Sequence, residues 1–190
     1  MSENLKLTLS TSHAYEVATF SGGTASWTPN GDASGNDYNE AINANTKVNA
    51  NGGNWYYPWY AATAGQGTNT ASPTINRSIC PKGWRLPDNS SNPSFYNLVT
   101  TRYGITTGSA GIALLKSSPL SYTSLGYYHA DGLSDTPAGY YWSASPNTSD
   151  SIRAYMLFFR DSSSYTPYLI SPQDSTGKFI GGSVRCVAIP

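Results

Sequence analysis

The chain has 190 residues and a mass of 20.3 kDa, a size that suits one domain. Its 11 basic residues balance its 11 acidic residues, and only 12% of residues are charged, so we expect neither nucleic acid nor an anionic membrane as a partner. The 15 Tyr and 5 Trp residues supply core area, because each aromatic side chain buries roughly 150–250 Å².

The N-terminal residues 1–54 are expected to form a strand and loop extension packed on a main domain of residues 55–190. Leu5, Leu7 and Leu9 alternate with polar residues, which predicts one half-buried strand. Beyond Gly22 the chain is rich in Gly, Asn, Asp and Ser, which predicts loops. An aromatic cluster follows, which we expect to pack on the core: Trp55, Tyr56, Tyr57, Trp59 and Tyr60.

Two helices are predicted in the middle of the chain. The first spans residues 92–104, with Asn92 as N-cap, Pro93 at the first helical position and Gly104 in the left-handed conformation after its end. Its apolar face is expected to comprise Phe95, Leu98, Val99 and Tyr103. A shorter helix is expected over Ser109–Lys116.

From Leu120 onward, turn signals separate runs rich in Tyr, Trp, Phe and Ile, which predicts an antiparallel sheet. The expected turns lie at residues 130–132, 137–139, 161–164 and 176–177. The order of loops, one or two helices and then strands predicts a loop-rich α+β domain.

The chain has two cysteines, Cys80 and Cys186, which are far apart in the sequence. They are either buried free thiols or a disulfide. Abundant Ser, Thr and Asn with scarce Lys and Glu is typical of an extracellular surface, and this setting favours the disulfide. Residues 1–10 lack the pattern of a signal peptide, so we expect a cell-surface or extracellular domain that is part of a longer exported protein, or else a cytosolic one.

Three segments flank the first helix in a specific order: SICPKGWRLPD at residues 78–88, GYYWSAS at 139–145 and GGSVRCV at 181–187. Together they resemble the bacterial major-paralogue surface domain, often called FISUMP, a branch of the C-type lectin-like fold. The resemblance covers about residues 55–190. It implies that Trp84, Leu86, Trp142 and Val184 are framework residues and that Cys80 and Cys186 are paired. Gly83, Gly139 and Gly181 are expected at tight turns.

The resemblance extends to the variable proteins of diversity-generating retroelements, in which mutagenesis directed at adenines rewrites a C-terminal binding surface. Of the 15 Asn residues, 14 lie at or before Asn97 and only Asn147 lies after it. Because Asn codons are preferred templates, a rewritten region loses Asn, and residues 147–168 have the expected mixture. The alternative is that a sheet-rich half disfavours Asn.

The sequence favours a protein that is not an enzyme and has no cofactor. The formylglycine-generating oxidases also resemble the RLP and GGS segments, but their chemistry requires reactive or metal-bound thiols beyond this cysteine pair. His13 and His129 accompany no Gly-x-Ser-x-Gly motif, and no zinc cluster is evident. Calcium stays open, because five aspartates fall on expected loops: Asp131, Asp135, Asp150, Asp161 and Asp174.

The strand IRAYMLFFRD at residues 152–161 is the expected binding surface. Alternation places Tyr155, Leu157 and Phe159 on one face of the strand and the even-numbered side chains on the other. The resemblance implies that Leu157 and Phe159 face inward, so the even-numbered side chains are expected to face outward. Aromatic and Arg anchors among Ser residues are typical of antibody-like binding surfaces. The expected contact residues are Asp150, Ser151, Ile152, Met156, Phe158, Arg160, Ser162, Tyr165, Tyr168 and Phe179. The alternative is that these Tyr and Phe residues belong to the core.

These observations predict a monomeric ligand-binding module of a bacterial surface protein that recognises a protein or glycan partner. A structural or adhesive domain without a defined pocket is the second hypothesis.

Overall fold

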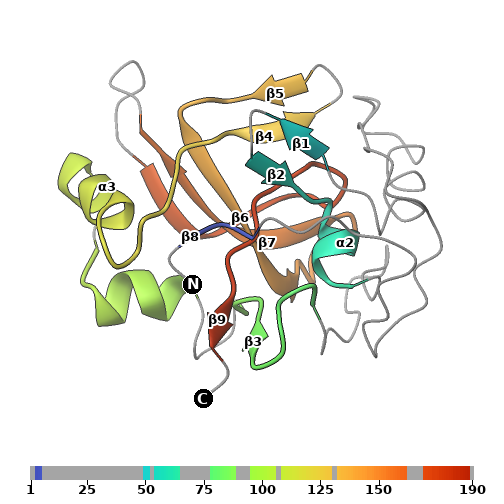
Figure 1. Ribbon diagram of the computed structural model, residues 1–190, viewed down its shortest axis with the longest axis horizontal. Coiled ribbons are helices and arrows are strands. Elements are labelled where there is room, and N and C mark those ends of the chain that lie inside the picture. Colours follow the sequence, from blue (N-terminus) through green and yellow to red (C-terminus); the bar gives the residue numbers. More distant parts are fainter. Residues whose placement is uncertain are drawn as a thin grey trace.

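The computed structural model of the chain describes residues 3–5, 49–51, 54–64, 78–88, 95–105, 108–129, 132–161 and 169–188. The described elements confirm the α+β class (Figure 1). In chain order they are β1 (Asn49–Asn51), β2 (Asn54–Tyr56), α2 (Trp59–Ala62), β3 (Trp84–Arg85), the π-helix η1 (Asn97–Arg102), α3 (Ser109–Lys116), β4 (Tyr127–His129), β5 (Gly132–Ser134), β6 (Ala138–Pro146), β7 (Arg153–Arg160), β8 (Leu169–Gly177) and β9 (Val187–Ala188).

The main sheet is antiparallel and has the order β6-β7-β8. Tyr141 lies opposite Leu157, and Trp142 lies opposite Met156. Because successive side chains alternate along a strand, the pair Tyr141–Leu157 faces one side of the sheet and the pair Trp142–Met156 faces the other. Three two-stranded sheets surround it: β1 with β2, β3 with β9, and β4 with β5. The C-terminal antiparallel sheet predicted from the sequence is thereby confirmed.

The helix-side core covers one face of the main sheet, where α3 lies (Figure 1). In α3 the buried positions are Gly111, Ile112 and Leu115, the spacing of a helix that packs one face on a core. The bounds predicted for this helix are confirmed. This core comprises Phe95, Val99, Ile105, Ile112, Leu115, Leu120, Tyr122, Tyr141, Leu157, Phe159 and Ile170.

The first predicted helix is only partly regular. Phe95 and Tyr96 are α-helical, η1 follows as a π-helix, and the proposed cap at Asn92 lies outside the described residues. Phe95 and Val99 are buried as expected, but Tyr103 is exposed. Gly104 has φ +58°, which confirms its left-handed conformation.

The disulfide-side core covers the opposite face of the sheet and draws on distant parts of the chain. It includes Leu5, the aromatic segment Tyr57–Tyr60, Leu86, Trp142, Met156 and residues 179–186. Two indole groups connect these segments: Trp59 Nε1 donates to the Ser143 carbonyl at 2.9 Å, and Trp142 Nε1 donates to the Tyr57 carbonyl at 2.8 Å. The aromatic cluster therefore packs on the core, as the sequence predicts.

A disulfide joins Cys80 to Cys186 across 106 residues, which confirms the predicted pairing. Beside it, β3 pairs with β9 through Trp84 opposite Ala188 and Arg85 opposite Val187. Leu86, Trp142 and Val184 are buried, in agreement with their expected framework role, whereas Trp84 is only half-buried.

Two expectations from the sequence are wrong at Gly139: the turn at residues 137–139 and the placement of Gly139 in a tight turn. Residues 137–139 were expected to form a turn, but β6 begins at Ala138, so Gly139 lies within a strand. The reason for glycine here is close packing, since a Cβ at this position would lie 2.2 Å from Cε1 of Phe159. Gly83, by contrast, has φ +82°, the conformation that a tight turn requires.

The expected boundary between residues 54 and 55 falls inside β2. The predicted strand is described only at residue 5, where the backbone amide of Leu5 donates to the Val184 carbonyl at 2.9 Å. Residues 6–48, which include the rest of the expected strand and most of the expected extension, lie outside the described part of the chain.

Candidate functional site

Strand β7 carries three of the ten predicted binding residues, Met156, Phe158 and Arg160, and both of its faces are covered. Leu157 and Phe159 are fully buried in the helix-side core, which confirms their inward assignment. The even-numbered face was expected to contact a partner. Instead it packs against the disulfide-side core, which approaches from segments far away in the sequence.

Three predicted contact residues are therefore wrongly placed on the surface. Met156 is 1% exposed, Phe158 is 5% exposed and Phe179 is 8% exposed. Met156 and Phe179 belong to the disulfide-side core, and Phe158 lies beneath Tyr140. A partner docking on the folded domain does not reach Met156 or Phe179.

The remaining described contact residues separate into two groups at opposite ends of β7. Asp150, Ser151 and Ile152 precede the strand, and Arg160 ends it. Eight strand residues span roughly 25 Å at ~3.3 Å per residue. The two groups therefore cannot bind the same small ligand. Ser162, Tyr165 and Tyr168 lie outside the described residues.

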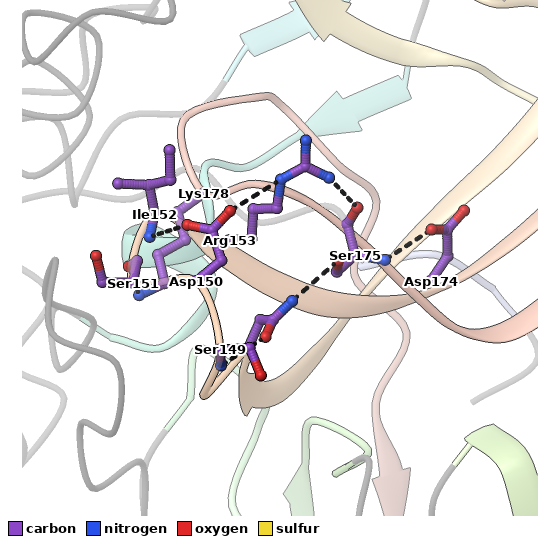
Figure 2. Close-up of polar contacts among 9 residues, drawn as sticks. Ser149, Asp150, Ser151, Ile152, Arg153, Asp174, Ser175 and Lys178 are labelled. Carbon is purple, nitrogen blue, oxygen red and sulfur yellow. Dashed lines mark hydrogen bonds and ion pairs between the residues drawn. The ribbon is translucent and has the colours of Figure 1, made fainter.

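The turn between β6 and β7 is held by a dense polar network (Figure 2). Asp150 accepts a hydrogen bond from the Ile152 backbone amide at 3.2 Å and forms an ion pair with Arg153 at 3.3 Å. Arg153 also donates to the Ser175 carbonyl on β8 at 3.1 Å. The Asp150 carboxylate is thus used within the turn itself.

Lys178 fixes this turn from the interior. Its Nζ donates to the Ser151 carbonyl at 2.6 Å and lies 4.8 Å from the centre of the Trp59 ring. Burial lowers the pKa of Lys178 to about 8, and the negative charge of Asp150 opposes this shift. No pattern in the sequence marks Lys178, because a lysine after a predicted turn is usually solvated.

At the other end of β7 lies a group of five side chains that we call the Tyr140 patch: Tyr127, Asp135, Tyr140, Phe158 and Arg160, of which Phe158 is buried and only the other four reach the surface. It forms because β4 starts beside β6, where Gly126 bridges Gly139. Except for Phe158, each of these residues is half-buried.

Aromatic contacts set the geometry of the Tyr140 patch. The ring of Tyr140 lies between Tyr127, with centroids 4.9 Å apart, and Phe158, with centroids 5.0 Å apart. The guanidinium of Arg160 lies 5.3 Å from the Phe158 ring centre, within the range of a cation–π interaction. Three aromatic side chains and one cation are thereby held in one arrangement.

The Asp135 carboxylate fixes the polar half of the patch. Arg160 Nη2 lies 2.7 Å from Asp135 Oδ2, and the Tyr140 hydroxyl donates a short hydrogen bond to the same oxygen. Burial, followed by the hydrogen bond to Asp135, raises the pKa of Tyr140 well above its usual value. The hydrogen bond to Asp135 likewise raises the pKa of Arg160. Tyr140 therefore stays neutral and Arg160 stays charged across the physiological pH range.

The loop aspartates proposed for calcium do not converge. Asp135 pairs with Arg160, Asp150 with Arg153, and Asp161 with Lys116. Asp174 accepts a hydrogen bond from the Ser175 backbone amide at 2.8 Å. Within the described ranges, no group of three or more His, Cys, Asp or Glu residues is placed to hold a metal ion. Asp131 lies outside those ranges.

Sequence reasoning named Phe158 and Arg160, of which Phe158 is buried, but it missed Tyr127 and Tyr140 and considered Asp135 only as a loop carboxylate for calcium. The available signal was the tandem Tyr140-Tyr141: in a strand, neighbouring side chains face opposite sides, so only one of the two can enter the helix-side core. Asp135 carried no signal, because its role depends on the contact with Arg160, 25 residues away.

Comparison with known proteins finds no matching family model, no matching curated protein and no matching solved structure. In the part of the chain that the structure describes, every helix is too short or too polar to span a lipid bilayer.

Proposed function

We propose that this chain is a ligand-binding module of a bacterial surface protein, with a FISUMP-like version of the C-type lectin-like fold, and that it recognises a protein or glycan partner through the Tyr140 patch. The observation that carries the proposal is the fixed arrangement of Tyr127, Tyr140 and Arg160 around Asp135. Tyr and Arg are enriched among the residues that dominate binding energy at interfaces.

Preorganisation supports this choice of surface. A side chain that is already immobilised loses less conformational entropy on binding, about 0.5–1.5 kcal/mol per ordered side chain. Tyr140 is held by its hydroxyl and by two neighbouring rings, and Arg160 by Asp135 and Phe158. The turn at Asp150 is also rigid, but its polar groups bond mainly to one another.

The disulfide supports an extracellular or cell-surface location, because such bonds persist in oxidising compartments. Both cysteines of the chain are used in it, which supports a binding role over an oxidase that needs a reactive thiol. Retroelement diversification is part of the proposal only for positions with an accessible side chain, because rewriting Met156 or Phe158 would disturb the core.

Binding by matched pairs of variants tests the proposal. The patch variants are Tyr127→Ala and Arg160→Ala. The controls are Tyr155→Ala and Arg153→Ala, which replace the same residue types in the first half of β7, at the opposite end from Arg160. Partners selected from a displayed protein library and a glycan array are titrated against each variant, with the disulfide intact. We expect the patch variants to lose at least tenfold in affinity and the controls less than about twofold.

Two results would contradict this proposal. If Arg153→Ala and Tyr155→Ala lose affinity while the patch variants do not, the turn end of β7 is the binding surface. If folded protein retains no partner in either screen, a structural or adhesive role replaces the binding role.

A further inference from the structure

The molecule has a groove of about 430 Å³ that shares no lining residue with the Tyr140 patch. Four distant segments form it: the N-terminal residues 3–4, the start of β2, residues 121–125 and Arg185. Leu125 is its one apolar lining residue among the described part of the chain. The polar lining residues are Glu3, Asn4, Asn54, Ser121, Thr123 and Arg185.

The floor of the groove is prearranged by Arg185, which is almost completely buried. Its Nη2 donates to Asn4 Oδ1 at 2.8 Å and to the Ser121 carbonyl at 2.9 Å, and its Nη1 donates to the Leu120 carbonyl. The guanidinium also lies 4.5 Å from the centre of the Tyr122 ring. Arg185 therefore acts as a fixed scaffold of the groove.

The wall is fixed by a second set of contacts. Asn4 Nδ2 donates to Thr123 Oγ1 at 3.2 Å, so both ends of the Asn4 amide are oriented. Tyr141, from the helix-side core, accepts a hydrogen bond from the Thr123 backbone amide at 2.9 Å. These contacts hold the lining groups in place before any ligand arrives, which lowers the entropic cost of binding.

The chemistry of the lining selects against charged ligands. An anion would meet the Glu3 carboxylate, and the Arg185 guanidinium already donates to three protein oxygen atoms. A cation would be repelled by the Arg185 guanidinium and would find only one carboxylate, that of Glu3, among the described lining residues. Amide and hydroxyl groups, which both donate and accept, make up the rest of the polar lining. A neutral ligand with many hydroxyl groups matches these groups best.

We propose that this groove is a second binding site, for a neutral saccharide unit. The volume lies within the ~300–1,000 Å³ range of small-molecule sites. This site goes beyond the proposed function, because a macromolecular partner on the Tyr140 patch does not require it.

Titration of the full ¹⁵N-labelled chain with galactose, mannose and N-acetylglucosamine, each alone, tests the inference by NMR. We expect at least one sugar to give saturable shifts of the Asn4 and Asn54 side-chain amides, with a Kd in roughly the millimolar range. Ser121→Ala with Glu3→Gln should weaken that binding at least threefold. The matched control Ser149→Ala with Asp174→Asn changes the same kinds of groups outside the groove, between β6 and β7 and on β8, and should leave the binding unchanged.

The inference is wrong if none of the three sugars shifts the Asn4 and Asn54 amides of the folded protein. It is also wrong if acetate or phosphate shifts them while the sugars do not, because the groove is then an anion site. Glu3→Gln alone, an isosteric change at an exposed residue, serves if the double variant does not fold. None of these outcomes alters the expectation for the Tyr127 and Arg160 variants, so the two proposals are tested separately.

Discussion

The two faces of the main sheet are covered in different ways. The helix-side core is built mostly from one continuous part of the chain, residues 95–122, which lies directly before the sheet. The disulfide-side core gathers Leu5, residues 57–64, residues 79–86 and residues 179–186 around Trp142. One face is thus closed by local structure, and the other depends on contacts between segments that are far apart in the sequence.

Loss of the disulfide should have the largest effect and should separate the two faces. In the chain-entropy account, closing a loop of 106 residues stabilises the fold by about 5 kcal/mol. The double variant Cys80→Ala with Cys186→Ala should lose most of this stability in denaturant unfolding. Hydrogen exchange should accelerate first at Ser183 and Gly182 on the disulfide side, and later in α3. Equal acceleration on both faces would show that they open as one unit.

Trp142→Ala should cost about 3–5 kcal/mol, because it empties the centre of the disulfide-side core. Phe159→Ala, its counterpart on the other face, should cost less, since Trp142 also loses the hydrogen bond to the Tyr57 carbonyl. Leu133→Ala is the control, because a side chain that is 45% exposed should change stability by less than about 0.5 kcal/mol. A larger loss for Phe159→Ala would reverse this ranking of the two faces.

Gly139→Ala should destabilise the helix side by about 1–3 kcal/mol through overpacking. The added Cβ would lie 2.2 Å from the Phe159 ring, within a well-packed core. The double variant Gly139→Ala with Phe159→Leu should lose less stability than the two single variants lose together, because the smaller Leu side chain leaves room for the added Cβ. Strict additivity in thermal unfolding would contradict the packing explanation.

The smallest expected effect is a pH dependence on the disulfide side. The folded-state pKa of Lys178 is about 8, below its usual 10.5, so between these values the unfolded chain binds more protons. Stability should therefore rise by about 1–2 kcal/mol from pH 7.5 to 9.5. Lys178→Met should abolish the rise, whereas Lys82→Met, at an exposed site, should preserve it. A rise that persists in Lys178→Met would assign it to another group.

Tyrosines set the upper limit of this pH window. Burial raises the pKa of Tyr56 from 10 to about 12, so above pH 10 the unfolded chain releases its proton first. Stability should then fall as the pH rises further. Burial also raises the pKa values of Tyr122 and Tyr140, so three tyrosines together oppose the rise from Lys178, and the maximum is expected between pH 9 and 10.

The contrast between the faces also explains what the sequence could predict. The helix Ser109–Lys116 and the separation of β7 into two faces follow from local spacing, and both are observed. The inward position of Leu157 and Phe159, which was expected from the family resemblance, is also observed. The cysteine pairing was expected from composition and from matched motifs, and it too is present. The helix and the strand pattern can be predicted from neighbouring residues, and the disulfide can be predicted because the chain has only one pair of cysteines.

The wrongly predicted surface of β7 has a physical cause. Alternation separates the two faces of a strand but does not say which of them is covered. The nearly unbroken apolar run Ala154–Phe159 is typical of a strand that is buried on both sides, and this signal outweighs alternation. The segments that cover Met156 come from residues 57–64 and 179–186, so no local pattern identifies them.

The long-range closure of the disulfide side has a consequence for how the chain acquires its structure during synthesis. Tyr57 pairs with Gly182, and the Trp59 amide bonds to the Lys178 carbonyl. A chain that emerges from its N-terminus presents the aromatic segment Trp55–Tyr60 more than 100 residues before its partners exist. Such a high contact order slows folding and exposes apolar surface meanwhile. The helix side, whose segments emerge together, is therefore the natural first unit to fold, and the aromatic segment needs protection until residues 178–182 have been made.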